Sequence, residues 1–422
     1  MTHSIITTGL DIGTTKICAM IGNYNQEENS YQILGVGQAP SKGLKRGVVI
    51  DIEETKQSII KAVAEAEKQS GITISAVTIG IAGDHIRSLD SSSTIAVSHK
   101  NTGSDTSSPV DQSDVIRALD SVRNINLGVD REIIHVIPQE FIVDDQMGVK
   151  NPIQMSGSRL TVNAHIVTAA INNVKNLVRS VQSTGLNVQD IVLEPLASSK
   201  AILSSDQKEL GVALVDIGGG TTDITVFQDG SVRHTGVIGY GGSIITKDIA
   251  SIVQTSFHEA ERIKKNYAWA SSVLADQSGP QDLVVSSLSD SKEIHLNSYQ
   301  LSQYVEARIE EILMMVRDEI CKYTDLKTLH AGIVFTGGGS RLKGLCQMSE
   351  QIFMIPAQIG YPIRLPGLET NEYGPEYSTV IGLLDWTEKQ KNKDLILTRK
   401  DSDSKVWSKL KKVISDIAKN LF

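Results

Sequence analysis

Three stretches far apart in the chain combine glycines with hydroxyl and carboxylate side chains in a spacing suited to binding phosphate. The longest reads V-A-L-V-D-I-G-G-G-T-T-D-I over residues 212–224. An apolar run that ends in consecutive glycines predicts a buried strand, a tight turn and a second strand. Glycine has no Cβ, so backbone N–H groups can converge on an anion, and Thr221 and Thr222 add hydroxyl donors. A glycine-rich hairpin without a ligand is the alternative interpretation.

The other two stretches favour the phosphate interpretation. The D-I-G-T-T-K of residues 11–16 repeats the core of D-I-G-G-G-T-T about two hundred residues earlier. Residues 333–344 read I-V-F-T-G-G-G-S-R-L-K-G, a short strand, three glycines and a Ser-led helix start that suit close approach to a flat ligand. Two half-clamps and a third glycine turn predict one nucleotide held between two related halves.

These loops resemble the two phosphate loops and the adenosine loop of actin-like ATPases, a superfamily that includes DnaK-type chaperones and sugar kinases. Within it, the chain is similar over nearly its whole length to the FtsA family of bacterial cell-division proteins. The stretches that carry this resemblance are G-L-K-R-G-V-V-I-D at 43–51, H-V-I-P-Q-E-F at 135–141, G-V-K-N-P at 148–152 and E-L-G-V-A-L-V-D-I-G-G-G-T-T-D at 209–223. It implies an α/β, actin-like two-lobed fold with duplicated ribonuclease-H-like halves, an inserted small α+β subdomain and a C-terminal amphipathic helix on a flexible linker.

The resemblance also implies a division into subdomains. We expect subdomain 1A at 1–83 and 162–195 with part of 379–390, inserted subdomain 1C at 84–161, subdomain 2A at 196–226 and 309–378, subdomain 2B at 227–308, a linker at 387–404 and the amphipathic helix at 405–422. From the residues alone, 84–161 is a separate small α+β module.

The cofactors implied are ATP and Mg²⁺, and their expected ligands lie in the three loops and in an E-x-x-K helix. The nucleotide-binding residues are Gly13, Thr14, Thr15, Lys16, Gly218, Gly219, Gly220, Thr221, Thr222, Glu261, Lys264, Gly337, Gly338, Gly339 and Arg341. Asp11 and Asp216 are expected to hold Mg²⁺ through water, and Glu194, which precedes Pro195, to position the attacking water. The residues alone also allow a solvated Lys16, a surface ion pair between Glu261 and Lys264, and a helix-start glutamate at 194 favoured by the helix dipole.

Bulk properties agree with a cytoplasmic, multi-domain protein. The chain has 422 residues, of which 40% are hydrophobic and 21% charged, and its formal net charge of −8 argues against broad nucleic-acid binding. Three cysteines without metal-like spacing fit a reducing compartment. We expect neither a signal peptide nor a run of roughly twenty apolar residues that could cross a bilayer.

Several elements are expected to position the loops. Asp51-x-x-Glu54 predicts a capping box and a helix ended by Gly71, with Ile52, Ile59, Ile60, Val63 and Ala66 facing inward. Asn172 is expected to cap a second helix. Ser92–Pro109 and Asp276–Lys292 are polar and predict loops.

The last eighteen residues regain a helical period after a highly charged linker. Five lysines against Asp416 leave four net positive charges on one face of this helix. The apolar side and its aromatic margins consist of Val406, Trp407, Leu410, Val413, Ile414, Ile417, Leu421 and Phe422. A lysine-rich amphipathic helix on a tether predicts an interfacial membrane anchor that binds anionic lipids. A helix docked on its own protein or on a partner is the alternative.

The resemblance implies a protein that polymerises on the inner face of the cell membrane at the division site. There it would bind the C-terminal tail of FtsZ through subdomain 2B, tie FtsZ filaments to the membrane and recruit later division proteins. Hydrolysis is expected to be slow at most, because the subdomain that carries an extra catalytic lysine in DnaK-type chaperones is replaced. A soluble kinase of the same superfamily that phosphorylates a small molecule is the alternative. A chaperone would need a peptide-binding domain after the core.

Overall fold

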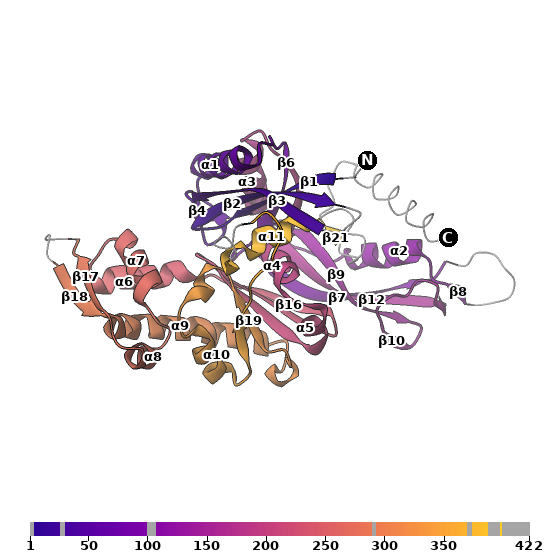
Figure 1. Cartoon of the computed structure of the whole chain (residues 1–422). Coiled ribbons are helices and arrows are strands. Elements are labelled where there is room, and N and C mark those ends of the chain that lie inside the picture. The colour runs from indigo at the N-terminus through magenta and orange to yellow at the C-terminus, as the bar shows by residue number, and fades with distance from the viewer. Residues whose placement is uncertain are drawn as a thin grey trace. The chain divides into compact units, whose positions relative to one another are not determined.

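The computed structural model describes residues 4–25, 30–98, 107–288, 293–368, 374–386 and 397–398. Its contacts divide the chain into two compact units (Figure 1). Unit 1 comprises Met1–Ser88 and Ala169–Asp385, and unit 2 comprises Leu89–Thr168 and Trp386–Phe422. All of the expected nucleotide- and magnesium-binding residues belong to unit 1, so its two sheets are described first.

The first sheet of unit 1 is a five-stranded mixed sheet in the order β13-β6-β1-β2-β3. Strands β1 (Ser4–Ile12), β2 (Lys16–Asn25) and β3 (Ser30–Pro40) form an antiparallel meander. Strands β6 (Ala76–Ile81) and β13 (Asn187–Leu193) extend it in parallel from β1. A small hairpin, β4 (Leu44–Lys45) and β5 (Val48–Val49), follows the meander.

The second sheet repeats this arrangement strand for strand. Strands β14 (Val212–Ile217), β15 (Thr222–Gln228) and β16 (Ser231–Ile238) form the meander. Strands β19 (Ile333–Thr336) and β20 (Ala357–Ile359) extend it in parallel from β14. The order β16-β15-β14-β19-β20 therefore matches β3-β2-β1-β6-β13, and the predicted duplication of the two halves is confirmed.

Two short helices lie between the halves and contact each other. Helix α4 (Glu194–Ile202) packs on β14 and β15, and α11 (Ser378–Leu384) packs on β1 and β2. They approach closely because residue 382 is glycine: a Cβ there would lie 1.9 Å from the carbonyl oxygen of Ala197. Helix α4 begins with the sequence Glu194-Pro195, as expected for proline in a first helical turn.

Helix α1 (Ile52–Ser70) covers β2 and β3 and ends at Gly71, whose φ of 70° suits glycine. Its start differs from the prediction. The Asp51 carboxylate accepts the Glu54 N–H at 3.0 Å, but the Asp51 N–H donates to the Gly43 carbonyl instead of to Glu54, so the cap is one-sided. Ile52 and Ile60 are each 38% exposed. The prediction that both face inward was wrong, because Thr55, Ser58 and Ala62 occupy the buried face instead.

Helix α3 (Ile171–Gln182) packs on α1 and β13 and buries Val174, Leu177 and Val181. The expected Asn172 cap is wrong. Ala170 occupies the N-cap without a side-chain hydrogen bond, so the helix starts directly from the preceding strand and Asn172 lies inside its first turn.

The rest of unit 1 follows the second meander. Helices α6 (Gly242–Val253), α7 (Phe257–Tyr267) and α8 (Ser272–Gln277) precede a hairpin of β17 (Asp282–Ser286) and β18 (Glu293–Asn297) and the long helix α9 (Ser298–Cys321). The expected loop at Asp276–Lys292 was therefore wrong in part. In β17, the buried residues Leu283 and Val285 alternate with exposed ones. The surrounding serines and charged residues made this stretch look like a loop by composition. The remaining elements are α5 (Ser205–Leu210), α10 (Leu345–Phe353) and the 3₁₀ turns η1 (Leu326–Thr328), η2 (Gly338–Arg341) and η4 (Pro375–Tyr377).

Unit 2 has its own sheet, in the order β10-β9-β12-β7, and its own apolar core. Its strands are β7 (Arg87–Ala96), β9 (Arg131–Val143), β10 (Gln146–Val149) and β12 (Arg159–Ala170), with a two-stranded pair of β8 (Ser108–Pro109) and β11 (Ser156–Gly157) and the helix α2 (Gln112–Val122). The loop predicted at Ser92–Pro109 was wrong over Ser92–Ala96, where the polar residues of β7 continue as a strand, and at Ser108–Pro109, which form β8. Within the predicted linker, β21 (Leu397–Thr398) pairs with β9. The eight expected membrane-facing residues, 406 to 422, lie outside the described residues.

Candidate functional site

The two predicted phosphate loops occupy equivalent hairpins of the duplicated sheets. In the first, the Gly13 N–H donates to the Lys16 carbonyl at 3.1 Å. In the second, the Gly218 N–H donates to the Thr221 carbonyl at 2.9 Å. In each turn the N–H of the glycine in D-I-G donates to the carbonyl of the residue three positions later. The shared sequence pattern therefore reflects a shared backbone geometry.

The loops face each other in direct contact. A Cβ at Gly219 would lie 2.4 Å from Thr15 Cγ2, and a Cβ at Gly220 would lie 2.5 Å from Thr14 Oγ1. No larger residue fits at either position without moving the opposite loop. The absence of side chains at 219 and 220 thus brings backbone N–H groups and threonine hydroxyls from both halves to one place.

Four carboxylates gather beside the loops: Asp11, Glu194, Asp216 and Asp223. Burial raises the pKa of Asp11 to about 6, with Lys16 opposing the shift and Asp216 adding to it. Burial also raises the pKa of Asp216 to about 6, against a hydrogen bond from Ser198. Burial followed by the charge of Asp216 raises the pKa of Asp223 to about 8. These acids are crowded and poorly hydrated, which makes a nearby cation favourable.

Glu194 is also a buried carboxylate that lies close to the other three acids. Burial, then the charges of Asp11, Asp223 and Asp216, raise its pKa well above the usual range. Its side chain lies against β6 because residue 80 is glycine, where a Cβ would be 2.8 Å from Glu194 Cγ. The structure thus brings Glu194 into the acid cluster together with the two expected magnesium-binding aspartates.

The acid cluster suits a cation held through water. The Asp223 Oδ1 atom is buried and has no hydrogen-bond partner, which is costly unless a ligand or ion satisfies it. Among the described residues, no group of three or more His, Cys, Asp or Glu converges closely enough to ligate a metal directly. A hydrated Mg²⁺, which keeps several of its waters, is the ion that fits such an arrangement.

Lys16 is half-buried and its amine is bound to other groups, whereas the simpler interpretation of its position was a solvated lysine. Its Nζ donates to the Glu376 carbonyl at 3.0 Å and lies 4.3 Å from the centre of the Tyr377 ring. Both partners belong to η4, immediately before α11. The lysine of the first loop is therefore held at the helix that runs between the halves.

The E-x-x-K pair is anchored to the second phosphate loop through a glycine turn. Lys264 Nζ lies 2.7 Å from Glu261 Oε2 and donates to the Gly242 carbonyl at 2.9 Å. The Gly242 N–H in turn donates to the Gly218 carbonyl at 2.9 Å. Burial lowers the pKa of Lys264. Burial raises the pKa of Glu261, but the charge of Lys264 and its hydrogen bond outweigh burial, so the pKa of Glu261 lies below its usual value. The pair is thus more than a surface ion pair.

The third glycine turn packs on the end of β14. A Cβ at Gly337 would lie 2.2 Å from Asp216 Oδ1, and a Cβ at Gly339 would lie 2.4 Å from Ile217 Cγ2. Gly338 is exposed, with only Glu376 Cβ, 4.0 Å from its Cβ position. Arg341 pairs with Glu376 at 2.6 Å. The turn continues as η2 and not as the Ser-led helix expected, because α10 starts only at Leu345.

Sequence reasoning missed three residues of the site. Asp223 was quoted within the motif but not assigned, although its register opposite Asp216 follows from the hairpin. Ser198 donates to Asp216 Oδ2 at 2.9 Å and lies 3.0 Å from the Thr379 hydroxyl. No signal in the sequence marks Ser198 or Thr379, because they come from two helices that meet only in the folded chain.

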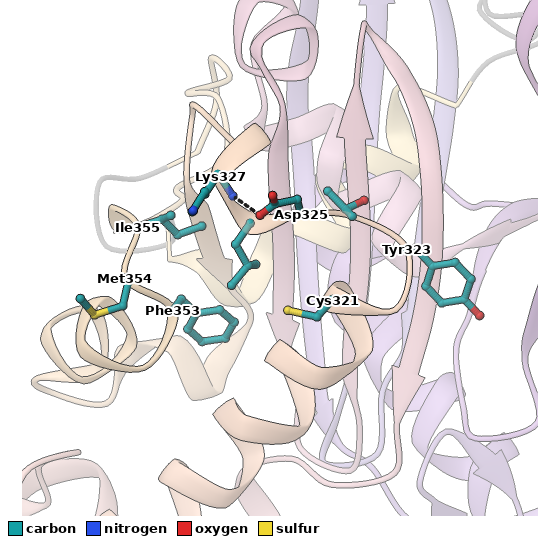
Figure 2. A pocket seen from close by; sticks show the side chains of 9 residues that line it. Cys321, Tyr323, Asp325, Lys327, Phe353, Met354 and Ile355 are labelled. Carbon is teal, nitrogen blue, oxygen red and sulfur yellow. Dashed lines mark hydrogen bonds between the residues drawn. The ribbon is translucent and has the colours of Figure 1, made fainter.

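A pocket of about 570 Å³ lies away from these loops (Figure 2). It is formed by the end of α9, η1 and the end of α10, and its lining includes Cys321, Tyr323, Phe353, Met354 and Ile355. The dashed contact in Figure 2 joins the Lys327 N–H to the Asp325 carboxylate and caps η1. This pocket contains none of the glycine turns or buried acids described above.

Comparison with known sequences shows to which family the chain belongs. The family model described as cell division protein FtsA matches residues 213–382, and one described as an SHS2 domain inserted in FtsA matches residues 83–168. The chain is 41% identical to the cell division protein FtsA of Pseudomonas aeruginosa, over 89% of this chain and 88% of that protein. It is 33% identical to FtsA of Escherichia coli K12, over 90% and 89% of the two chains. The chain belongs to the FtsA family.

Solved structures support the actin-like fold of this FtsA family member. It superposes on a PilM-PilN type IV pilus biogenesis complex with a TM-score of 0.62 at 14% identity, covering 90% of this chain and 98% of the other. It superposes on MreB5 of Spiroplasma citri bound to ADP with a TM-score of 0.54 at 14% identity, covering 92% and 98%. At such identities the likeness shows the fold alone. Within the described residues, no helix is both long and apolar enough to span a membrane.

Proposed function

We propose that this FtsA family member is an actin-like ATP-binding protein that polymerises on the inner face of the cytoplasmic membrane during cell division. There it ties FtsZ filaments to the membrane and helps to recruit later division proteins. The observation that carries the proposal is the pair of equivalent hairpin loops that face each other beside four crowded carboxylates. Family membership supports the cellular role, and the MreB5 structures bound to ADP and to AMPPNP, which share this fold, support the binding of a nucleotide.

In this proposal the two loops hold the phosphates of ATP. Backbone N–H groups at residues 219 and 220 and the Thr14 and Thr15 hydroxyls supply donors without adding bulk. Lys264 and Glu261 fix the turn at Gly242, and Gly337–Gly339 provide the flat surface for the adenosine. Binding at both loops closes the two halves on each other, which favours the polymer-competent shape.

Asp11 and Asp216 would hold Mg²⁺ through water, with the Ser198 hydroxyl orienting Asp216. The ion would neutralise charge on the phosphates. Glu194 is the residue placed to orient an attacking water. Burial among the other carboxylates raises the pKa of Glu194, which favours its neutral form and weakens it as a proton acceptor for that water. We therefore propose at most slow hydrolysis.

The membrane role is proposed from the sequence of residues 405–422. Each lysine near anionic lipid contributes about 1 kcal/mol, so four net charges would contribute roughly 4 kcal/mol before entropy costs. The apolar face adds burial at the headgroup boundary. We further propose that the C-terminal tail of FtsZ docks on residues 227–308, which include α6, α7, β17 and β18.

Vesicle co-sedimentation with Mg-ATP tests the proposal directly. We expect the full chain to pellet with anionic vesicles and a chain ending at Ser404 to stay in the supernatant, while both bind ATP equally. Filaments should form on the vesicles in electron micrographs. If both chains stay in the supernatant at low salt, the membrane role is wrong. If neither binds ATP, the assignment of the loops is wrong, whatever the vesicles show.

A further inference from the structure

The turn of the β4–β5 hairpin contains an arginine in an unfavourable backbone conformation. Leu44 pairs with Val49 and Lys45 with Val48, so Arg46 and Gly47 are the two turn residues. Both have positive φ, 51° for Arg46 and 74° for Gly47. Tight hairpins of this kind favour Asn-Gly or Gly-Gly, because Asn and Gly enter the left-handed region at least cost. An arginine in this strained conformation points to a role for its side chain.

The hairpin tip is fixed to the first phosphate loop. The Gly47 N–H donates to Thr14 Oγ1 at 3.0 Å. Gly47 also packs on the end of β6, where an added Cβ would lie 2.8 Å from both the Ala82 carbonyl oxygen and Gly83 Cα. The backbone of Arg46 is therefore positioned by the same threonine hydroxyl that faces Gly220 of the second loop.

The side chain of Arg46 crosses to the turn that supports the second loop. Its guanidinium carbon lies 5.4 Å from the centre of the Tyr240 ring, and Nη1 lies 3.8 Å from the Cβ position of Gly239. The Tyr240 carbonyl accepts a hydrogen bond from Thr222 Oγ1 at 2.8 Å. Arg46 is thus linked to both phosphate loops. Its chain neighbour Gly47 bonds to Thr14 of the first loop, and Tyr240, which its side chain contacts, bonds to Thr222 of the second.

The guanidinium is held only weakly in this place. Arg46 is exposed, and in the part of the chain that the structure describes it forms no ion pair, although the Asp84 side chain lies near Gly239 as well. An exposed cation–π contact is a weak restraint. The side chain can therefore leave Tyr240 when a stronger acceptor arrives.

A triphosphate at this site would place its negative charge beside four carboxylates, so a cation besides Mg²⁺ would stabilise it. Four carboxylates surround the loops, and the amine of Lys16 is already engaged by the Glu376 carbonyl. A guanidinium presents several N–H donors in one plane, which suits the oxygens of a phosphate. We propose that Arg46 binds the terminal phosphate of the bound nucleoside triphosphate and so distinguishes it from the diphosphate. This inference rests on the proposed nucleotide site.

Equilibrium binding of ATP and of ADP to the full chain, both with Mg²⁺, tests it. The main variant is Arg46→Asn, which suits the left-handed turn and should fold at least as well as the parent protein. We expect ATP affinity to fall about tenfold, the loss of a charge-assisted bond, and ADP affinity to change less than about threefold. Arg46→Lys should lie between the two. Lys45→Ala, an exposed cation one residue earlier, is the control and should leave both affinities unchanged.

The thermal midpoint of Arg46→Asn should equal or exceed that of the parent, because the strained turn is relieved. Equal ATP affinity in the parent and in Arg46→Asn would overturn the inference while leaving the nucleotide site intact. A parallel loss of ATP and ADP affinity would also overturn it, since that result indicates support of the loops and not recognition of the terminal phosphate. A parent protein that binds neither nucleotide would refute the site itself.

Discussion

Asp216 and Asp223 are direct cross-strand partners on β14 and β15, so two carboxylates share one buried level of the second sheet. Ser198 donates to Asp216, and Thr221 donates to Asp223 Oδ2 at 3.0 Å. Like charges that face each other in a sheet destabilise it. The free protein therefore carries an electrostatic cost at the place where a phosphate-bound cation would be most stabilising.

The pH dependence of stability follows from this pair. The pKa of Asp223 is about 8 in the folded protein, far above the value of about 3.9 for an unfolded aspartate. Between these values the folded state binds more protons, so stability falls as the pH rises. We expect the free energy of unfolding to fall from pH 6 to pH 8, by at most about 1.4 kcal/mol per pH unit from this group. The thermal midpoint should fall with it. Asp223→Asn, which can still accept the Thr221 bond, should flatten the slope, and identical slopes in the two proteins would refute the assignment.

The contact between the two phosphate loops predicts the effect of one added methyl group. Gly220→Ala places its Cβ 2.5 Å from Thr14 Oγ1, so the loops must move apart. We expect ATP affinity to fall about tenfold, because donors from the two halves no longer reach the same phosphates. Gly22→Ala is the control: Gly22 lies within β2, outside the loops, and its Cβ would have no neighbour closer than 3.5 Å, so affinity and thermal midpoint should stay unchanged. Unaltered ATP binding by Gly220→Ala, measured by calorimetry, would show that the loops do not act together.

Lys264 should matter far more than the adjacent Lys265. Lys264→Met removes the bond to the Gly242 carbonyl and the closer ion pair of Glu261, which keeps only Lys265 and Thr246 as partners, and we expect a loss of about 1–3 kcal/mol in the free energy of unfolding. ATP affinity should fall as well, since the turn at Gly242 supports the second loop. Lys265→Met is the matched control, because its side chain is 70% exposed and its ion pair with Glu261 is worth little. If Lys264→Met and Lys265→Met unfolded at the same urea concentration, Lys264 would not anchor the turn at Gly242.

The membrane anchor can be tested with one residue. Trp407→Glu puts a charge on the apolar face of the predicted helix, and we expect the variant to remain in the supernatant with anionic vesicles. Trp407→Leu keeps the face apolar and should still pellet. Raising the salt concentration should weaken binding of the parent, because the lysines act through screened charge. Intact vesicle binding by Trp407→Glu would refute the assignment of this apolar face as the membrane anchor.

Local rules located the loops but not every boundary around them. The D-I-G pattern and the flanking apolar residues required two hairpins, and both are present. The inward faces were predicted less well. Ile52 and Ile60 satisfy the helical period of α1 but are exposed, since the neighbouring strands contact the face with Thr55, Ser58 and Ala62. Similarly, Ser92–Ala96 looks like a loop by composition, yet it pairs as part of β7 because its neighbour in the sheet supplies the hydrogen bonds.

The sequence by itself determined the family, the duplicated fold and the residue types that could bind phosphate, because glycine turns and buried strands are encoded by neighbouring residues. Only the tertiary structure decided which side chains meet. Arg46, Ser198 and Thr379 come from a hairpin and two helices that are distant in the chain. Arg46 lies in a stretch that carries the family resemblance, but no local pattern indicates that these three side chains lie at the loops. The raised pKa values of Asp223 and Glu194 likewise arise from burial beside other carboxylates, a property of the packed molecule and not of any single segment.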